Sequence, residues 1–471
     1  MKRIMNRHAT SWALAAGAVL LLLAAAGSAG AQARIDGIEG FTTFNFRAGE
    51  GQVSIADGGS YEFWGYEDTG NNEGVGVPQY PGPTIIVNQG DNVTINLTSA
   101  LHAGCTSMVF PGHAVSASGG SPGLLTNESC GDTDTVTYTF TASEPGTYMY
   151  YSGTNPELQI EMGLLGAIIV RPSGHGYDGF NYAYNHDSSA FDHEVMFLLT
   201  SMDPHIHQLA EQHRYSEIDA TRRFPVYWFI NGRAAPDDLA EPFVGWLPHQ
   251  PYNCTPRMSP GQKLLVRILG GDMDQHPLHL HGNHYYEIAR YGRLLTLDDG
   301  TTLAKQGKFT TRSVPGQTVD AIFEWTGEKL GWDIYGSTVD GIAEHTCRDE
   351  YNNVTGATDP DGYADTIAQG CQSTAGTPDT CYAWEYCADH NKKFPVVLPE
   401  NQNLAFGGWW SGGPLMGVGE PLPPGEGGLN PYSGYFFMWH SHTEKELTNF
   451  DIFPGGMLSM MVVEPPGTPI E

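Results

Sequence analysis

Short runs of apolar and polar residues, bounded by turn-forming residues, recur along the whole chain. Val136, Tyr138 and Phe140 alternate with threonines, as expected for a strand with one buried face. Residues 164–170 form a continuous apolar run, which is typical of a fully buried strand. Long runs with the 3.6-residue period of a helix are nearly absent. This pattern predicts an all-β protein of the sandwich or barrel type.

The chain also repeats itself loosely, which predicts one strand plan used twice. Four segments have a later counterpart: NQGDNVTINLT (88–98) and SPGQKLLVRIL (259–269), TVTYTF (135–140) and TVDAIFEW (318–325), GTYMYYSG (146–153) and GYFFMWHSH (434–442), and MGLLGAIIVRP (162–172) and GGMLSMMVVEP (455–465). We therefore expect a first domain at about 34–173, a linker at 174–189 and a second domain at 190–467.

Two segments have no counterpart in this repeat. Residues 203–223 contain HIHQLAEQHRYSEI, which predicts a short helix or a loop, with its three histidines on a polar surface. Residues 333–431 form a long insertion rich in glycine, aspartate and cysteine. An insertion of this length is usually functional or a small subdomain, and its place before the motif at 440–442 suggests a lid.

The first residues resemble a secretory signal peptide. Basic residues precede an apolar run at 12–26, and small residues follow at 29–33. The run is short for a membrane-spanning helix, so we expect cleavage of 1–33 and no membrane span afterwards. The expected location is the periplasm or the exterior of the cell.

The charge and cysteine content narrow the choice of partners and compartment. The chain has 53 acidic and 23 basic residues, a balance that argues against binding to nucleic acid or an anionic membrane surface. Seven cysteines in an exported chain predict disulfides, with one thiol left over and the connectivity open. The four within 333–431 predict disulfide stapling of the insertion.

Two histidine motifs carry the candidate chemistry. They are DQHPLHLHGNHYYEI and MWHSHTEKE, which contain His276, His279, His281, His284, His440 and His442. An H-x-H pair on a strand points both imidazoles to one face, because side chains alternate with a period of two. Two such pairs on neighbouring strands would bring four imidazoles together, and neutral imidazole is a common ligand for copper and zinc. The alternative is a hydrogen-bonded structural cluster.

The motif HPLHLHG at 276–282 is similar to the H-P-x-H-L-H-G signature of multicopper oxidases. HSH at 440–442 stands where that family carries H-C-H. The first domain resembles the family in PGPTIIVNQGDNVTINL, TVTYTFTASEPGTYMYYSG and GLLGAIIV. The resemblance implies two cupredoxin-like Greek-key β-sandwich domains, the second interrupted by the cysteine-containing insertion. It also implies copper, with His276 as a type 1 ligand, His279 as a type 2 ligand, and His281, His440 and His442 as type 3 ligands.

The chain departs from the family at about half of the expected ligands. Ser441 replaces the type 1 cysteine, and the histidine expected five residues later falls near Glu446. In the first domain, Val109 and Pro111 stand where the family has one histidine pair, and 151–153 stand where it has the other. A blue copper centre needs the cysteine thiolate. The usual relay of electrons to dioxygen is therefore not expected to operate. Candidates for further copper ligands are His113, His284, Glu444 and Tyr151.

Three functions remain open at this point. The first is a copper-dependent oxidoreductase that acts on a metal ion or a small phenolic or organic reductant without a type 1 relay. The second is a non-catalytic copper-binding protein that sequesters or delivers the metal. The third is a metal-free scaffold. Two-domain members of the family often trimerise with copper between subunits, so a homo-oligomer is also considered, although the missing ligands weaken that expectation.

Overall fold

The computed structural model describes residues 34–70, 76–174, 181–327, 333–336, 385–386, 390, 412–414, 435–464, 468 and 470. Strands dominate this part of the chain, so the all-β prediction is confirmed. The helical elements within it are short: α2 (Pro156–Gln159), α3 (Pro204–Glu211), η3 (Asp187–Ser189), η4 (Tyr215–Glu217), η5 (Ala220–Arg222), η6 (Asp237–Leu239) and η10 (Glu444–Leu447).

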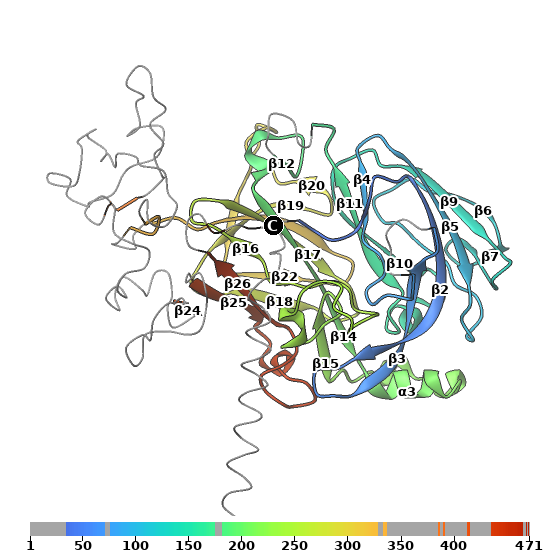
Figure 1. Ribbon diagram of the computed structural model, residues 1–471. Coiled ribbons are helices and arrows are strands. Elements are labelled where there is room, and N and C mark those ends of the chain that lie inside the picture. The colour runs from blue at the N-terminus through green and yellow to red at the C-terminus, as the bar shows by residue number, and fades with distance from the viewer. Residues whose placement is uncertain are drawn as a thin grey trace, which may run out of the picture.

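The N-terminal half of the described chain is a sandwich of two sheets, drawn in blue to cyan in Figure 1. The first sheet has the order β1 (Ile38–Glu39), β4 (Ile85–Asn88), β11 (Leu165–Arg171), β10 (Gly146–Tyr151). The second has the order β3 (Ser60–Asp68), β2 (Thr43–Ser54), β5 (Asn92–Ser99), β9 (Val136–Thr141), β6 (Ser116–Gly119). A small hairpin joins β7 (Ser121–Pro122) to β8 (Asn127–Glu128). One apolar core, with Phe44 and Ile95 from one sheet and Ile168 from the other, fills the space between them.

The C-terminal half is a second sandwich, drawn in green to red. One sheet has the order β15 (Tyr227–Ile230), β14 (His193–Met202), β17 (Lys263–Gly270), β23 (Thr318–Glu324), β19 (Tyr285–Arg290), β20 (Arg293–Leu294), and β21 (Gln306–Lys308) also pairs with β19. The facing sheet has the order β16 (Arg257–Met258), β26 (Leu458–Val463), β25 (Tyr435–Ser441), β18 (His276–Leu280), β22 (Thr310–Ser313), and β24 (Gly412–Pro414) also pairs with β25. Strands β12 (Asn181–Tyr182) and β13 (Ala190–Phe191) form a separate hairpin at the expected linker.

The same strand pairings occur in both sandwiches. In the first, β2 and β5 run parallel, β5 and β9 antiparallel, and β10 and β11 antiparallel. In the second, β14 and β17 run parallel, β17 and β23 antiparallel, and β25 and β26 antiparallel. The turns before β5 and β17 each place a glycine, Gly90 and Gly261, at positive φ, which a side chain would disfavour. The weak sequence repeat therefore reflects a real repeat of topology.

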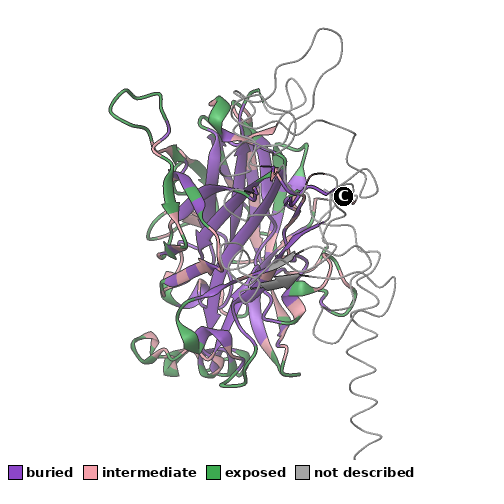
Figure 2. Ribbon diagram, turned by 90° about the vertical axis from the view of Figure 1, so that its left-hand side faces the viewer, coloured by how far each residue is buried: buried purple, intermediate pink, exposed green. Residues whose placement is uncertain are grey.

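The strands at the junction of the two sandwiches are buried on both faces, as the continuous purple strands in Figure 2 illustrate. Along β11, Ile168 points into the N-terminal core, while Ile169 packs against Leu198 and Leu269 of the C-terminal sandwich. A strand covered on both sides has no solvent face and needs no polar alternation. This explains the uninterrupted apolar run at 164–170.

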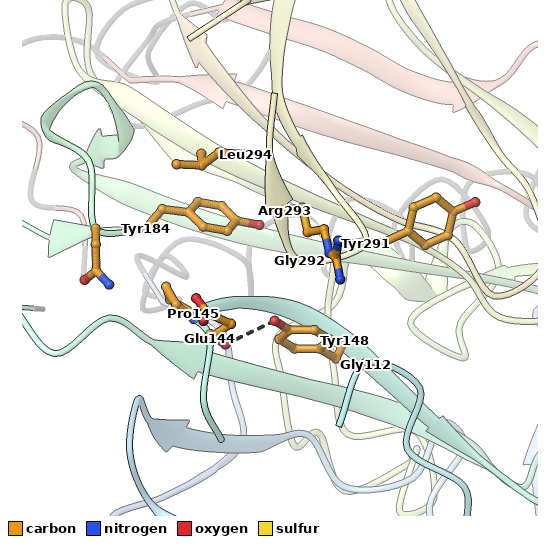
Figure 3. A pocket seen from close by; sticks show the side chains of 10 residues that line it. Gly112, Glu144, Pro145, Tyr148, Tyr184, Tyr291, Gly292, Arg293 and Leu294 are labelled. Carbon is orange, nitrogen blue, oxygen red and sulfur yellow. Dashed lines mark hydrogen bonds between the residues drawn. The ribbon is translucent and has the colours of Figure 1, made fainter. Parts of the chain in front are cut away.

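A cavity of about 420 Å³ lies at the edge of this junction (Figure 3). Tyr148 of β10 faces Tyr184 and Arg293 of the C-terminal half across it. The hydroxyl of Tyr148 donates to the carbonyl oxygen of Glu144 at 3.1 Å. None of the six candidate histidines lines this cavity. It is therefore separate from the proposed metal chemistry.

Segment 203–223 is folded as α3 followed by η4 and η5, which fits the expected short helix. Asp203 caps α3 by accepting from the His205 amide at 2.9 Å, and proline stands in the first turn. The expectation that all three histidines lie on a polar surface is wrong for His207, which is fully buried. Its Nδ1 contacts the carbonyl oxygen of Glu62 at 2.5 Å, so α3 is pinned to the N-terminal sandwich.

The cysteine predictions are confirmed in part. Cys105 and Cys130 form a disulfide, and Cys254 is a buried free thiol. The other four cysteines, and most of the insertion at 333–431, lie outside the described residues, as does the expected signal peptide at 1–33. Within the described chain, no helix has the length and apolar character needed to cross a bilayer.

Candidate metal centre

The two histidine motifs lie on neighbouring antiparallel strands. His279 of β18 is paired directly with His440 of β25, and Leu278 is paired with Ser441. Antiparallel neighbours bring directly opposite side chains within about 5 Å at Cβ. Residues separated by about 160 positions in the sequence therefore form one cluster on one face of the sheet.

The period of two along each strand divides the histidines between two faces. His279 and His281 lie on the same face of β18, while His276 lies with Leu278 and Leu280 on the face that packs into the core. On β25, Ser441 likewise points inward, between His440 and His442. His276 and His279 are three positions apart, so one flat strand cannot turn both to the same side.

His279, His281, His440 and His442 form the outer cluster, on the face of the sheet away from the core. The imidazole nitrogens of the first three converge. One ligand atom from each of His279, His281 and His440 lies in a group whose members are all within 4.8 Å of one another. The Nε2 atoms of His281 and His440 are 2.6 Å apart. The ring of His442 lies 4.9 Å from that of His279, centroid to centroid. Three imidazoles thus converge on one small volume, and the ring of His442 lies beside that of His279.

Hydrogen bonds orient two of these rings. The Nδ1 of His440 donates to the carbonyl oxygen of Ser441 at 2.6 Å, which leaves its Nε2 with a lone pair. The Nδ1 of His279 contacts the hydroxyl of Thr310 at 2.7 Å, so its Nε2 is also directed away from that partner. In metal sites the second ring nitrogen of a histidine ligand is held in this way by an oxygen. A metal ion would replace the direct contact between the Nε2 atoms of His281 and His440.

The electrostatics of the cluster favour neutral imidazole, the form that binds metal. Burial lowers the pKa of His279 to about 4, with further contributions from His440, His281 and His442. Burial also lowers the pKa of His440, although the carbonyl of Ser441 opposes the shift. The donor set therefore fits a metal ion that prefers nitrogen ligands, such as copper or zinc.

The remaining outer histidines differ in position. The side chain of His442 is 55% exposed, and its Nδ1 lies 3.6 Å from Glu444, so the cluster reaches solvent through this residue. His284 is exposed and packs on Phe309 with 3.8 Å between ring centroids, outside the converging group. His113 is sandwiched between Phe140 and Tyr148 in the N-terminal half, also outside that group. These two histidines are not brought to the cluster.

His276 takes part in a different arrangement, inside the sandwich. Its Nδ1 lies 3.0 Å from Glu446, and its Nε2 lies 3.1 Å from Asp272. Burial disfavours a charged ring here, but the two carboxylates outweigh it and raise the pKa of His276 to about 10. An imidazolium with both nitrogens donating has no lone pair left for a metal. As placed here, His276 is a charged partner of Asp272 and Glu446.

The positions that the family resemblance assigns to the type 1 copper ligands do meet in space. Ser441 donates its hydroxyl proton to Glu446 at 2.5 Å, and the same carboxylate oxygen faces His276. Serine and glutamate thus stand where the resemblance places cysteine and histidine. The three side chains satisfy one another through hydrogen bonds and charge, with no soft sulfur ligand among them.

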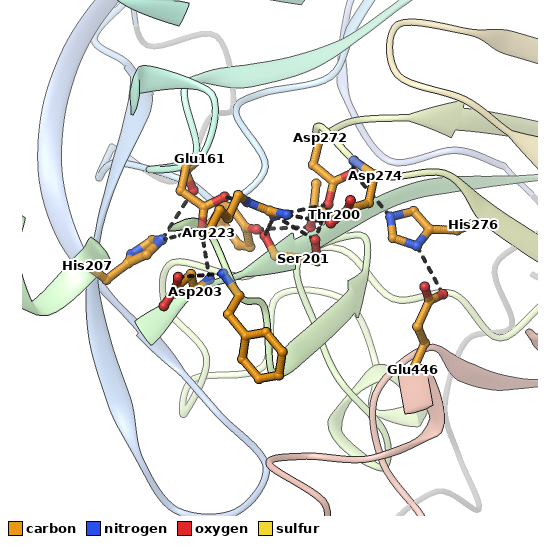
Figure 4. Close-up of polar contacts among 12 residues, drawn as sticks. Glu161, Thr200, Ser201, Asp203, His207, Arg223, Asp272, Asp274, His276 and Glu446 are labelled. Carbon is orange, nitrogen blue, oxygen red and sulfur yellow. Dashed lines mark hydrogen bonds and ion pairs between the residues drawn. The ribbon is translucent and has the colours of Figure 1, made fainter. Parts of the chain in front are cut away.

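A chain of buried polar groups extends from this point into the N-terminal half (Figure 4). Asp272 accepts a hydrogen bond from Ser201 and lies 3.6 Å from Arg223. Arg223 pairs with Glu161 at 2.5 Å, and Glu161 lies 3.8 Å from His207. The buried network therefore ties α3, the inter-sandwich junction and η10 together. Sequence reasoning missed Asp272 and Glu161, because nothing local marks a carboxylate whose partner is distant in sequence.

The N-terminal positions that lack histidines also lie side by side. Val109 and Tyr151 form an antiparallel bridge, with N–O distances of 2.9 and 3.2 Å. The two altered segments thus meet in space. They offer a valine methyl, a tyrosine and a glycine, so the described N-terminal half brings no imidazole to this bridge.

Comparison with known proteins finds matches to parts of the chain. Residues 64–175, from β3 to the end of β11, match a family model described as multicopper oxidase. L-ascorbate oxidase from Cucurbita pepo var. melopepo is 32% identical over 127 residues, which cover 26% of this chain and 22% of that protein. The iron transport multicopper oxidase FET3 of Saccharomyces cerevisiae is 35% identical over 114 residues, which cover 24% of this chain and 17% of that protein. The matched segments thus span about a fifth of these curated relatives.

The solved structures that match this chain are more distant in sequence. A blue copper oxidase from Nitrosomonas europaea has a TM-score of 0.46 and 16% identity, covering 89% of this chain and 85% of that one. A copper nitrite reductase from the same organism has a TM-score of 0.42 and 17% identity, covering 60% and 84%. The fold described above rests on the strand pairing itself. Residues 64–175 of the chain thus match the multicopper oxidase family, and parts of the chain are similar to curated multicopper oxidases.

Proposed function

We propose that this protein is an exported copper-binding oxidoreductase that works without a type 1 copper. Its copper would be held by the four outer histidines, and its reductant would be a metal ion or a small phenolic or organic molecule. The observation that carries this proposal is the convergence of His279, His281 and His440 in a group that opens to solvent at His442. The match of residues 64–175 to a multicopper oxidase model supports copper as the metal.

The ligand roles follow from the hydrogen bonds of each ring. His279 and His440 present Nε2, because Thr310 and the carbonyl of Ser441 hold their Nδ1 atoms. His281 offers the nitrogen that now faces His440. His442 lies on the exposed side and would complete the set or yield its place to a substrate. Bound copper would supply one-electron redox chemistry at this position.

The reductant would reach the copper by a different route than in an enzyme that has a type 1 copper. In a protein with a type 1 centre, electrons enter at a cysteine-bound copper and travel along the strand to the histidines on either side. Here that inner position is an ion pair of His276 with Asp272 and Glu446. We infer that electrons enter at the outer cluster itself. The exposed edge near His442 is then the place where a small reductant would come close to the histidines.

A second candidate is a non-catalytic protein that sequesters or delivers copper. The replacement of the inner ligands by a fully satisfied polar network favours it, because that network carries no redox-active group. The two functions share the same metal site and differ in whether bound copper is reduced and reoxidised. A metal-free scaffold is less well supported, since the rings of His279 and His440, whose pKa values burial lowers, face the other two histidines.

The deciding experiment measures copper content and the electron paramagnetic resonance spectrum of the copper-loaded full chain and of His279→Ala/His440→Ala. We expect the double variant to lose the copper signal. The exposed His205, which belongs to no metal group described here, provides the control His205→Ala. Copper that survives in the double variant would refute the assignment. Once the site is established, the bound copper is reduced and then exposed to dioxygen. Only an oxidoreductase should rapidly regain the spectrum of oxidised copper, so this step separates the two functions.

A further inference from the structure

A second cluster of metal-binding side chains lies away from the histidine site. Asp333 is the first residue of the long insertion at 333–431, and Glu385 and His390 lie further along it. One ligand atom from each residue belongs to a group in which all atoms are within 4.8 Å of one another. The Nδ1 of His390 lies 2.5 Å from Glu385. No motif in the sequence links these three positions.

The cluster is deeply buried. Asp333 is 5% exposed, Glu385 is 0% exposed, and the side chain of His390 is 7% exposed. Burying even one carboxylate is costly unless a charge or a metal compensates it. Two carboxylates close together repel each other. A divalent cation would balance both negative charges at once.

Asp333 is held on a rigid base. The next two residues, Ile334 and Tyr335, are buried in the core of the C-terminal sandwich. The backbone amide of Tyr335 donates to one oxygen of Asp333 at 2.8 Å. This contact orients the carboxylate in the way that outer partners orient metal ligands. The backbone of Tyr335 thus holds the carboxylate of Asp333 next to the core of the C-terminal sandwich.

We propose that Asp333, Glu385 and His390 form a structural site for a divalent metal ion of the zinc type, which clamps the insertion to the second sandwich. One imidazole and two carboxylates are a donor set that zinc accepts, whereas calcium and magnesium prefer oxygen alone. A metal bound by side chains that folding brings together stabilises the folded chain. This site does not depend on the proposed copper chemistry, since it shares no residue with the outer histidines.

The test uses the full chain carrying His279→Ala/His440→Ala, so that zinc cannot occupy the histidine cluster. The protein is stripped with a chelator, incubated with zinc, separated from free metal by gel filtration, and analysed for zinc by mass spectrometry. We expect one equivalent of zinc, which is lost when Asp333→Asn or His390→Ala is added. The control His205→Ala, added to the same background, keeps the zinc.

The outcomes separate the two proposals. If the background protein binds no zinc, or if both added variants retain it, the clamp does not exist. If a variant does not fold, zinc-edge X-ray absorption of the background protein decides: one imidazole with oxygen ligands supports the site, and several imidazoles or sulfur overturn it. With His279 and His440 intact, Asp333→Asn should still bind copper at the outer cluster. A protein that binds zinc at Asp333, Glu385 and His390 but binds no copper at the outer histidines would refute only the proposed function.

Discussion

The carboxylate of Glu446 lies 3.0 Å from the Nδ1 of His276, and both groups are buried. The same carboxylate accepts the hydroxyl proton of Ser441. Family resemblance assigns these three positions to the ligands of one copper ion. Here the side chains neutralise one another directly, so the inner position is stable without metal. The replacements at Ser441 and Glu446 fit together, because Glu446 accepts a hydrogen bond from Ser441 and pairs with the charged ring of His276.

A blue copper centre should therefore require more than one substitution. Ser441→Cys alone would place a thiolate beside Glu446, which still holds His276 as a charged donor. We expect no intense visible band after copper is added. Ser441→Cys/Glu446→His removes that carboxylate and supplies cysteine with two histidines, the ligand set of a blue centre. We expect this double variant to show the strong visible absorption of copper bound to thiolate.

The control for these two variants is Glu446→His alone. Because it has no cysteine, it should show no intense visible band after copper is added. Asp272 remains as a partner of His276 in all three variants, at 3.1 Å from Nε2. A strong band in Ser441→Cys alone would show that Glu446 does not prevent copper from reaching His276. A double variant that folds and binds copper without colour would show that Asp272 is sufficient to hold the histidine in its charged state.

Much of the fold and of the outer cluster could be predicted from the sequence. The alternation around Tyr138 and the repeat of 88–98 at 259–269 are local signals, and both correspond to real strands. The period of two also predicts that His279 and His281 share a face. The same rule separates His276 from His279, since three positions along a strand reverse the direction of a side chain. Applied to His276, it would have placed that residue in the core.

Other features could not be predicted, because they depend on contacts between distant residues. His207 looks like a polar surface residue, yet it is buried against the carbonyl oxygens of Glu62 and Glu161. Asp272 becomes meaningful only when β18 brings His276 next to it and η5 ends near Arg223. A buried carboxylate carries no local signature, since the sequence does not say which base will face it. Only the three-dimensional arrangement identifies these pairs.

Removing the Cys105–Cys130 disulfide should destabilise the N-terminal sandwich. The two residues are 25 positions apart, and a loop of this length loses enough chain entropy on closure to contribute about 3 kcal/mol. We expect Cys105→Ala/Cys130→Ala to lower the free energy of unfolding by that amount in urea titrations. Reduction of the unaltered protein under conditions that keep it folded gives a second estimate. An unchanged unfolding midpoint in both experiments would mean that residual structure in the unfolded chain offsets the effect.

The ion cluster at the junction of the sandwiches should contribute strongly to stability. Glu194 accepts from Arg171 of the N-terminal half at 2.8 Å and from Arg267 of its own sandwich at 3.0 Å, and all three side chains are buried. Glu194→Gln removes the negative charge that the buried guanidinium groups of Arg171 and Arg267 both contact. Loss of one partner from a buried ion pair typically costs about 3–5 kcal/mol. We expect a reduction of this order in urea unfolding, whereas Glu217→Gln at an exposed pair should leave the midpoint unchanged.

The same cluster predicts how stability depends on pH. Burial alone would raise the pKa of Glu194, but Arg171 and Arg267 outweigh it and lower the pKa to about 2 from an ordinary value of 4.5. The unfolded chain therefore takes up this proton first as the solution is acidified. The contribution of Glu194 is complete above about pH 4.5 and is lost as the pH falls toward 2. In urea unfolding at a series of pH values, the stability difference between the unaltered protein and Glu194→Gln should be constant near neutrality and shrink below pH 4.5. A difference that stays constant through the acid range would mean that the arginines do not lower the pKa of this carboxylate.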